Sequence, residues 1–234
     1  MKRLWLAMVC LATCTSAVAA DESKAVSQLE KSTSVLNEIM TAPDKAIPGD
    51  LFSKAVCVGI VPAEVRIAVG IGGTYGRGVL VCRRHGNGPW GAPSLFRLGG
   101  ANIGFQLGGK ATDVVFLVMN ARGAKKLVVD DVKLGADASA AAGPVGRTAE
   151  GATDAQMNAE ILSYSRTKGL FAGVSLEGAV FKQDAGNNEK LYGQKLEPKQ
   201  ILIDGSVKTP VAARPLDNAL TKCSPRGGAP FSKS

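Results

Sequence analysis

The sequence predicts an α+β fold, with a strand-rich, curved antiparallel sheet or barrel-like core, an N-terminal helix and short peripheral helices. Apolar residues recur at helical spacing in 22–40, whereas central segments such as 65–73 alternate branched apolar with small residues. Glycine is frequent inside those central segments. Because glycine weakens a strand unless a bulge, a close backbone approach or strong curvature requires it, the pattern favours a coiled sheet over a flat one.

The first twenty residues have the organisation of a secretory signal peptide. Two basic residues precede a short apolar run, and Ala17-Val18-Ala19 matches an A-x-A cleavage site. The apolar run is shorter than the roughly 20 residues that a membrane-spanning helix needs. We therefore expect export to the periplasm, with lipoprotein processing at Cys14 as the alternative, and a mature domain over 21–223.

The chain is basic, with a formal net charge of +8 that falls to +6 once Lys2 and Arg3 leave with the signal peptide. A scattered surplus of this size suits an anionic membrane surface or a polyanion. It is equally typical of a soluble protein with an ordinary basic balance.

Three cysteines remain after the signal peptide: Cys57, Cys82 and Cys223. Cys57 and Cys82 each lie in an apolar, strand-like segment, so a disulfide between them is predicted in an oxidising compartment, with Cys223 unpaired. Buried free thiols are the alternative. No Cys-x-x-Cys or Cys/His cluster occurs, which argues against a metal site of the zinc type.

The elements follow in order along the chain. The helix at 22–40 has a narrow apolar face, which favours packing on the core over a membrane or partner role, and Pro43 prevents its continuation. A turn is expected at Asn87-Gly88, and residues 224–234 are predicted to be disordered. Short helices are expected at 121–128, 187–192 and 216–222. Successively paired antiparallel strands are expected at 55–61, 65–73, 78–84, 95–109, 113–119, 132–141, 161–166 and 170–181.

Catalytic and nucleotide-binding motifs are weak. The glycine run at 70–78 has the wrong spacing for a dinucleotide fingerprint and leads into a strand, whereas a phosphate cradle needs a helix N-terminus. His85 is the single histidine, beside a turn and without an orienting carboxylate, so it is interpreted as a solvated residue. Ser163 and Ser165 beside Arg166 are the main residues that would suggest a hydrolase. We therefore predict neither an enzyme nor a cofactor.

Several charged residues stand inside apolar or small-residue segments. Buried charges must be paired, so these residues predict internal ion pairs that hold loops to the sheet. The alternative is that Arg77, Arg147, Arg166 and Lys168 converge on one anion site, where guanidinium groups grip a phosphate. The charged residues concerned are Arg77, Asp113, Asp137, Arg147, Arg166 and Glu177.

Four segments closely resemble the SYLF-domain family: 73–79 (Gly-Thr-Tyr-Gly-Arg-Gly-Val), 90–94 (Trp-Gly-Ala-Pro-Ser), 135–147 and 163–178. The likeness runs from about residue 50 to 193, and the signal peptide resembles the bacterial, exported branch. The resemblance implies lipid binding, because eukaryotic members associate with phosphoinositide membranes and some with actin. Bacterial envelopes generally lack phosphoinositides and actin, which limits how far the functions of eukaryotic members can be expected of this chain.

The expected function is therefore a non-enzymatic, lipid-binding protein of the cell envelope that prefers anionic phospholipid headgroups. The alternative is a periplasmic protein-interaction or scaffold module. Expected partners are an anionic membrane surface or an envelope protein, and no nucleic acid.

Overall fold

The computed structural model describes residues 24–39, 47–69, 71–102, 108–129, 131–145, 158–167 and 170–224. Several sequence predictions fall outside these ranges. They are the signal peptide with Cys14, the residues Arg147 and Lys168, and the tail from 225 onward.

Nine strands form one curled sheet in the order β5-β9-β3-β2-β1-β4-β7-β6, with β8 paired to β7. The named strand pairs are antiparallel except β6 with β7. The α+β class with a curved, strand-rich core is therefore confirmed. The strands are β1 Cys57–Val69, β2 Ile71–Arg83, β3 Trp90–Asn102, β4 Gly108–Val118, β5 Val132–Lys133, β6 Ala140–Ala142, β7 Ile161–Thr167, β8 Leu170–Gly173 and β9 Val180–Gln183.

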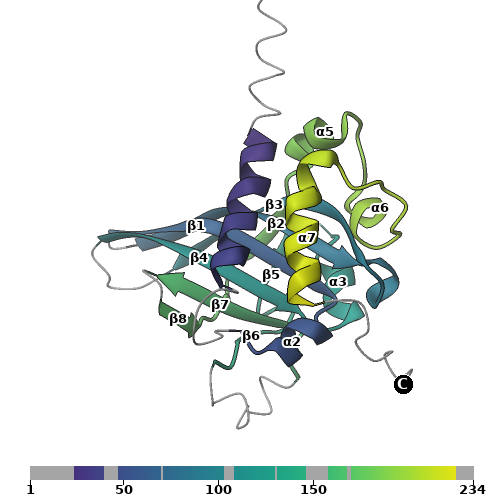
Figure 1. The fold of residues 1–234 in the computed structure, drawn as a ribbon. Helices are drawn as coiled ribbons and strands as arrows, with labels where there is room; N and C mark the ends of the chain where they lie inside the picture. The colour runs from purple at the N-terminus through teal and green to yellow at the C-terminus, as the bar shows by residue number, and fades with distance from the viewer. Residues whose placement is uncertain are drawn as a thin grey trace, which may run out of the picture.

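Helices cover the sheet and its edges (Figure 1). The N-terminal helix spans 24–39, close to the predicted 22–40. The three predicted short helices are also present, as α3, α5 and α7. Sequence reasoning missed α2 and α6, although a capping box between Glu197 and Gln200 and Pro198 at the first turn mark α6. The bounds are α2 Gly49–Lys54, α3 Ala121–Lys126, α5 Ala185–Tyr192, α6 Pro198–Leu202 and α7 Arg214–Cys223.

One face of the sheet packs against the N-terminal helix and α7, which lie next to each other in Figure 1. Leu29 and Leu36 of the first helix and Leu220 of α7 are buried there against Val58 and Val79 of the sheet. The narrow apolar face of the N-terminal helix thus packs on the core, as predicted.

The opposite face is filled by an aromatic cluster. The ring of Phe96 stacks on Phe181 at 4.5 Å between centroids and meets Phe116 edge-on at 5.7 Å. A Cβ atom at Gly59 would lie 2.1 Å from the Phe116 ring, and one at Gly78 would lie 2.4 Å from the Phe96 ring. These two glycines let the large rings lie flat on the strands, which is the close approach that the sequence predicts for glycine inside strands.

Two predicted strands run across chain reversals. The segment 65–73 is not one strand, because β1 ends at Val69, β2 begins at Ile71, and these two residues pair antiparallel. Alternation of apolar residues continues through the reversal since paired residues share a face of the sheet. The predicted strand at 95–109 likewise covers the end of β3 and the start of β4.

Strand pairing differs from the successive pairing that the sequence predicts. Strand β1 pairs with both β2 and β4, so β4 does not follow β3 in the sheet.

Two predicted strands are also interrupted by turns. The segment 132–141 is broken at Gly135 (φ +92°), where the Asp137 carboxylate accepts a hydrogen bond from the amide of Lys133 at 2.7 Å. The segment 170–181 is broken at Gly178 (φ +82°). A positive φ at each glycine turns the chain out of the extended conformation.

Two of the three described cysteines are buried in the sheet. Cys57 and Cys82 face each other in the register of β1 and β2 and are joined by a disulfide. Cys223 is free, at the end of α7, and packs partly buried against the core. Burial raises the pKa of the Cys223 thiol to about 11, against a smaller lowering by a hydrogen bond to its own backbone.

Candidate anion-binding site

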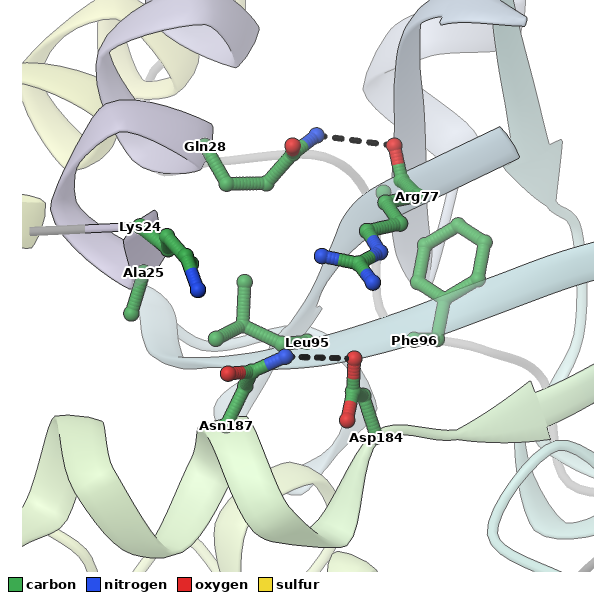
Figure 2. Close-up of a pocket in the computed structure, with 9 residues that line it drawn as sticks. Lys24, Ala25, Gln28, Arg77, Leu95, Phe96, Asp184 and Asn187 are labelled. Atoms are coloured by element: carbon green, nitrogen blue, oxygen red, sulfur yellow. Dashed lines mark hydrogen bonds between the residues drawn. The ribbon is translucent and has the colours of Figure 1, made fainter. Parts of the chain in front are cut away.

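Arg77 lies in a small pocket between the N-terminal helix, β2 and α5 (Figure 2). Gln28 of the helix fixes this junction by donating a hydrogen bond to the carbonyl oxygen of Arg77 at 2.7 Å. Asp184, which precedes α5, and Lys24 line the same pocket. Its volume of about 30 Å³ has room for a water-sized group, so a larger anion would have to sit at its mouth.

Positive charge exceeds negative charge around this pocket. Arg97 of β3 stands directly opposite Arg77 in the β2–β3 register. Like charges at directly opposite positions destabilise a sheet unless something neutralises them. Asp184 supplies one negative charge, with its Oδ1 atom 3.0 Å from the Arg97 Nη2 atom. We call Lys24, Arg77 and Arg97 the cationic cluster; among the described residues that line the pocket, Asp184 is the acidic one.

The guanidinium of Arg77 is held at one end. Its Nε atom donates to the hydroxyl of Tyr75 at 2.9 Å, and Tyr75 is 49% exposed. This hydrogen bond and the charge interactions with Tyr75 and Asp184 raise the pKa of Arg77 above its ordinary value, against a lowering by partial burial. Within the described chain, the two terminal nitrogens of Arg77 have no hydrogen-bond or ion-pair partner. Figure 2 shows them pointing into the pocket from β2.

Arg166 belongs to a different arrangement. Its Nε atom lies 3.3 Å from Asp113 on the neighbouring strand β4, and its Nη2 atom pairs with Glu38 of the N-terminal helix. Asp113 also accepts a hydrogen bond from the amide of Ala63 at 3.0 Å. The hydrogen bonds from Arg166 and Ser34 lower the pKa of Glu38, despite a small opposing effect of burial. This is the internal ion pairing that the sequence predicts for Arg166 and Asp113.

Of the four residues proposed as one anion site, the structure describes only Arg77 and Arg166, and these two belong to different arrangements. Arg77 and Arg166 lie on β2 and β7, three strand spacings or about 14 Å apart in the sheet. Arg147 and Lys168 lie outside the described residues.

Sequence reasoning missed four residues of this site: Lys24, Tyr75, Arg97 and Asp184. The spacing of Tyr75 and Arg77 by two residues on a strand could have indicated their shared face. The position of Arg97 depends on the strand register, and Asp184 arrives from a distant part of the chain. Neither can be read from local sequence.

A second, more open cleft of about 270 Å³ lies beside α3. Its buried carboxylate, Glu160, pairs with Lys126 at 2.7 Å and accepts a hydrogen bond from the Ser139 amide at 2.9 Å. Burial raises the pKa of Glu160, but the hydrogen bonds and charges of Lys126, Ser139 and Arg122 outweigh it, so the net pKa is lowered. Glu160 thus ties α3 to the loop before β7.

The residues that could suggest catalysis have structural settings. Ser163 is buried, and its hydroxyl donates to the carbonyl oxygen of Val174 at 2.8 Å. His85 lies exposed in the short 3-10 turn Arg84–Gly86, as predicted. Among the described residues, no group of three or more histidine, cysteine or acidic side chains is placed to hold a metal ion. None of the helices in the described ranges is long and apolar enough to cross a bilayer.

Comparison with known proteins identifies relatives of this chain. The Ysc84 family model, described as "Las17-binding protein actin regulator", matches residues 99–223. LAS seventeen-binding protein 3 of Saccharomyces cerevisiae (strain ATCC 204508 / S288c) is 36% identical over 188 residues, covering 79% of this chain and 40% of that protein. Protein YSC84 of the same yeast is 34% identical, covering 83% and 42%. SH3 domain-containing YSC84-like protein 1 of Bos taurus is 30% identical, covering 83% and 58%.

The chain spans 40% to 58% of the length of these relatives. The name of the first describes a binding protein, and none of the three names describes an enzyme. The matched half of the chain includes the end of β3, strands β4 to β9 and the C-terminal helices. The chain therefore belongs to the Ysc84 family, the SYLF-domain family that its sequence resembles.

Proposed function

We propose that this Ysc84-family chain is a non-enzymatic protein of the cell envelope that associates with anionic phospholipid headgroups through the cationic cluster. The observation that carries the proposal is the unbalanced charge around Asp184, where Arg77 and Arg97 face each other and Arg77 keeps two nitrogens without a partner in the described chain. A phosphate can accept two parallel hydrogen bonds from such a guanidinium.

The neighbouring side chain suits the same role. Tyr75 is half exposed and shares a hydrogen bond with Arg77. Tyrosine has an apolar ring and a polar tip, and such residues are enriched where proteins meet the headgroup layer of a membrane. An aromatic ring beside an arginine on a strand is therefore a suitable contact for a lipid surface.

The periplasm is the proposed location. The signal-peptide pattern of residues 1–20 supports it, and so does the disulfide between Cys57 and Cys82, since such bonds persist in oxidising compartments. The absence of catalysis is part of the proposal. It is supported by the names of the relatives and by the occupied hydroxyl of Ser163, and a blank esterase and phosphatase screen is the expected result.

Co-flotation of the purified protein with vesicles tests the function. We expect flotation with phosphatidylglycerol or cardiolipin vesicles, none with phosphatidylcholine vesicles, and weaker binding at physiological than at low salt. The variant Arg77→Gln removes one cation near the surface, which contributes about 1 kcal/mol, so its affinity should fall about five-fold.

The matched control is Lys222→Gln, which makes the same charge change at an exposed position of α7. Its affinity should stay close to that of the parent protein. Flotation with no vesicle in any condition would exclude the lipid function. Equal losses in both variants would show that diffuse charge, and not the cationic cluster, determines binding.

The second candidate is a protein-interaction module, favoured by relatives whose names state that they bind Las17. The partner here would be an envelope protein. This candidate predicts a stoichiometric partner in a cross-linked pull-down from envelope extracts, together with no vesicle binding by the purified protein.

A further inference from the structure

We propose that the open cleft beside α3 binds a neutral ligand with several hydroxyl groups, such as a sugar unit, through the carboxylate of Glu160. This Glu160 cleft, of about 270 Å³, is lined by residues of α3, of the turn 134–138 and of the segment that precedes β7. None of its described lining residues belongs to the pocket of the cationic cluster. The inference therefore stands independently of the lipid function and goes beyond it.

One wall of the cleft holds a buried carboxylate with an unsatisfied oxygen atom. The Glu160 side chain is 6% exposed, and its Oε2 atom accepts hydrogen bonds from Lys126 at 2.7 Å and from the Ser139 amide at 2.9 Å. Its Oε1 atom accepts none within the described chain, since the Nε atom of Arg122, at 3.7 Å, is beyond hydrogen-bond distance. An unsatisfied buried acceptor, above all a charged one, is costly, so Oε1 would gain from a donor on a ligand.

The position of this carboxylate is fixed by the chain around it. The Glu160 amide donates to the hydroxyl of Ser139 at 3.0 Å, and the Glu160 carbonyl oxygen accepts from the amide of Met119 at 2.9 Å. Burial raises the pKa of Glu160, but the hydrogen bonds and charges of its neighbours outweigh this effect and lower it overall, so the group is charged at neutral pH. A charged carboxylate only accepts hydrogen bonds. The cleft therefore offers a rigid acceptor that requires a donor.

Another wall of the cleft is a tight turn that supplies a second acceptor. Within it the Gly135 amide donates to the carbonyl oxygen of Ala138 at 2.7 Å, and the Asp137 amide donates to that of Lys133 at 2.8 Å. The Lys133 amide in turn donates to Asp137 Oδ2 at 2.7 Å. In the part of the chain that the structure describes, the other oxygen of this carboxylate has no hydrogen-bond partner. The turn thus holds the exposed residues Ala136 and Asp137 at the cleft.

Hydrogen-bond donors come from α3 and from the residue before it. Asn120 caps the helix with its Oδ1 atom, which accepts from the Gly123 amide at 2.9 Å. Its side-chain nitrogen therefore keeps both hydrogens without an acceptor among the described residues. The Arg122 side chain is 80% exposed, so it can move aside without losing a buried contact. A ligand hydroxyl placed between Arg122 and Glu160 would accept from the guanidinium and donate to Oε1.

The balance of charge and of hydrogen-bonding groups defines the ligand. Two basic residues, Arg122 and Lys126, and two acidic ones, Asp137 and Glu160, line the described cleft. An anion would meet both carboxylates and a cation both basic groups, so a neutral ligand is favoured. A hydroxyl group donates and accepts, so adjacent hydroxyl groups satisfy the acceptors and the donors together. The volume corresponds to roughly nine water molecules of about 30 Å³ each, which suits one sugar ring.

Titration monitored by nuclear magnetic resonance tests the assignment. The isotope-labelled protein is mixed with methyl glycosides of glucose, mannose and N-acetylglucosamine, and separately with short oligosaccharides of the same sugars. We expect saturable shifts of the amide signals of Ala136 and Ser139, and none at Arg77, with at least one of these sugars. Stronger binding of the oligosaccharides would identify a glycan as the source of the ring, and equal or weaker binding would identify a free sugar. No shift with any sugar, or saturable shifts with inorganic phosphate alone, would overturn the proposal.

A pair of tryptophan variants tests the location of the ligand. Ala136→Trp fills the cleft from an exposed position and leaves the Glu160 carboxylate intact, so sugar binding should be lost. Ala172→Trp makes the same change at an exposed position of β8 and should bind like the parent protein. Both variants should keep the parent unfolding midpoint. Parental sugar binding by Ala136→Trp would show that the ligand lies elsewhere.

A second pair of variants tests the role of the carboxylate. Glu160→Gln keeps the size of the side chain but removes the charged acceptor, so sugar affinity should fall about tenfold. Glu189→Gln makes the same change at an exposed position of α5 and should bind like the parent protein. Affinities are compared at a temperature at which circular dichroism shows each variant to be folded. A folded Glu160→Gln variant with parental affinity would contradict the proposal.

Discussion

Two arginines on strand β2, one at its end and one in its middle, have very different surroundings. Arg83 is buried: it lies over the ring of Trp90 at 4.0 Å and donates to the carbonyl oxygens of Ala55 and Gly88 and to the hydroxyl of Ser224. Arg77 is exposed and is held by Tyr75 at one nitrogen. The same type of side chain is a structural element at the end of the strand and available for a ligand in its middle.

An irregularity divides strand β1 into two parts. The β1–β2 register shifts between Ile60 and Val65. Ala63 has a φ of 50°, and its amide is held by Asp113. Before this bulge β1 is buried by the helices on one face and the phenylalanine cluster on the other, and after it the strand continues to Val69. Stability and binding should therefore respond to different substitutions along one strand pair.

The largest loss of stability is expected from Phe116→Ala in the buried part of the sheet. Removing a ring that contacts Phe96 and fills the space above Gly59 should lower the free energy of unfolding by about 3–5 kcal/mol. Urea denaturation monitored by circular dichroism measures the loss. Val129→Ala, at an exposed site, should change stability by less than about 0.5 kcal/mol. A loss below about 1 kcal/mol for Phe116→Ala would show that the core closes around the gap.

The next effect is that of the disulfide. Replacing both Cys57 and Cys82 by alanine should lower the free energy of unfolding by about 2–4 kcal/mol, because the bond restricts the unfolded chain. Reduction of the parent protein with dithiothreitol should give a similar loss in urea denaturation. Vesicle binding under native conditions should persist, since neither cysteine lines the pocket of the cationic cluster. Lost binding in a folded variant would mean that the bond and the cationic cluster are coupled.

A smaller and pH-dependent effect is expected at Glu160. The lowered pKa means that the charged form stabilises the fold above the unfolded-state pKa of about 4.3, and that this contribution disappears as pH falls through the folded pKa. Glu160→Gln should lose about 1–3 kcal/mol at pH 7. The difference from the parent protein should shrink below pH 4 in thermal unfolding. A difference that stays constant from pH 7 to 3 would contradict this assignment.

The smallest effect is expected at the boundary between the two parts of β1. Asp113→Ala removes the acceptor for the Ala63 amide and the partner of Arg166, which should cost about 1 kcal/mol. Hydrogen exchange should show faster exchange at the Ala63 amide, with little change at the amide of Val58. Uniform acceleration along β1 would mean that the bulge does not divide the strand.

Part of this fold is predictable from local sequence because apolar residues recur there at the spacing of a helix or a strand. The N-terminal helix, α3, α5, α7 and β7 were all indicated by residue spacing. Hairpins were missed where alternation continues through the reversal, as at 65–73, since the paired strands present the same face. The interruptions at Gly135 and Gly178 were missed because, in the sequence, a glycine that turns the chain cannot be distinguished from one that lies inside a strand under an aromatic ring.

The candidate site was less predictable than the fold. Arg77 stood out as a charge among small residues, and Arg166 stood out for the same reason but is paired with Asp113 and Glu38. Local sequence does not distinguish these cases, because the difference depends on which carboxylate the fold brings near. Arg97 and Asp184 enter the site through strand register and through the approach of α5, which are tertiary properties.

The unpaired Cys223 affects how the disulfide between Cys57 and Cys82 forms. With the pKa of Cys223 near 11, only about one thiol in ten thousand is the reactive thiolate at neutral pH. Once α7 has docked, attack on the Cys57–Cys82 bond by this thiol is slow, so correct pairing is preserved kinetically. The period of risk is earlier, while the chain is still unfolded and the thiols of Cys57, Cys82 and Cys223 are equally free to pair. Docking of α7 therefore ends disulfide scrambling.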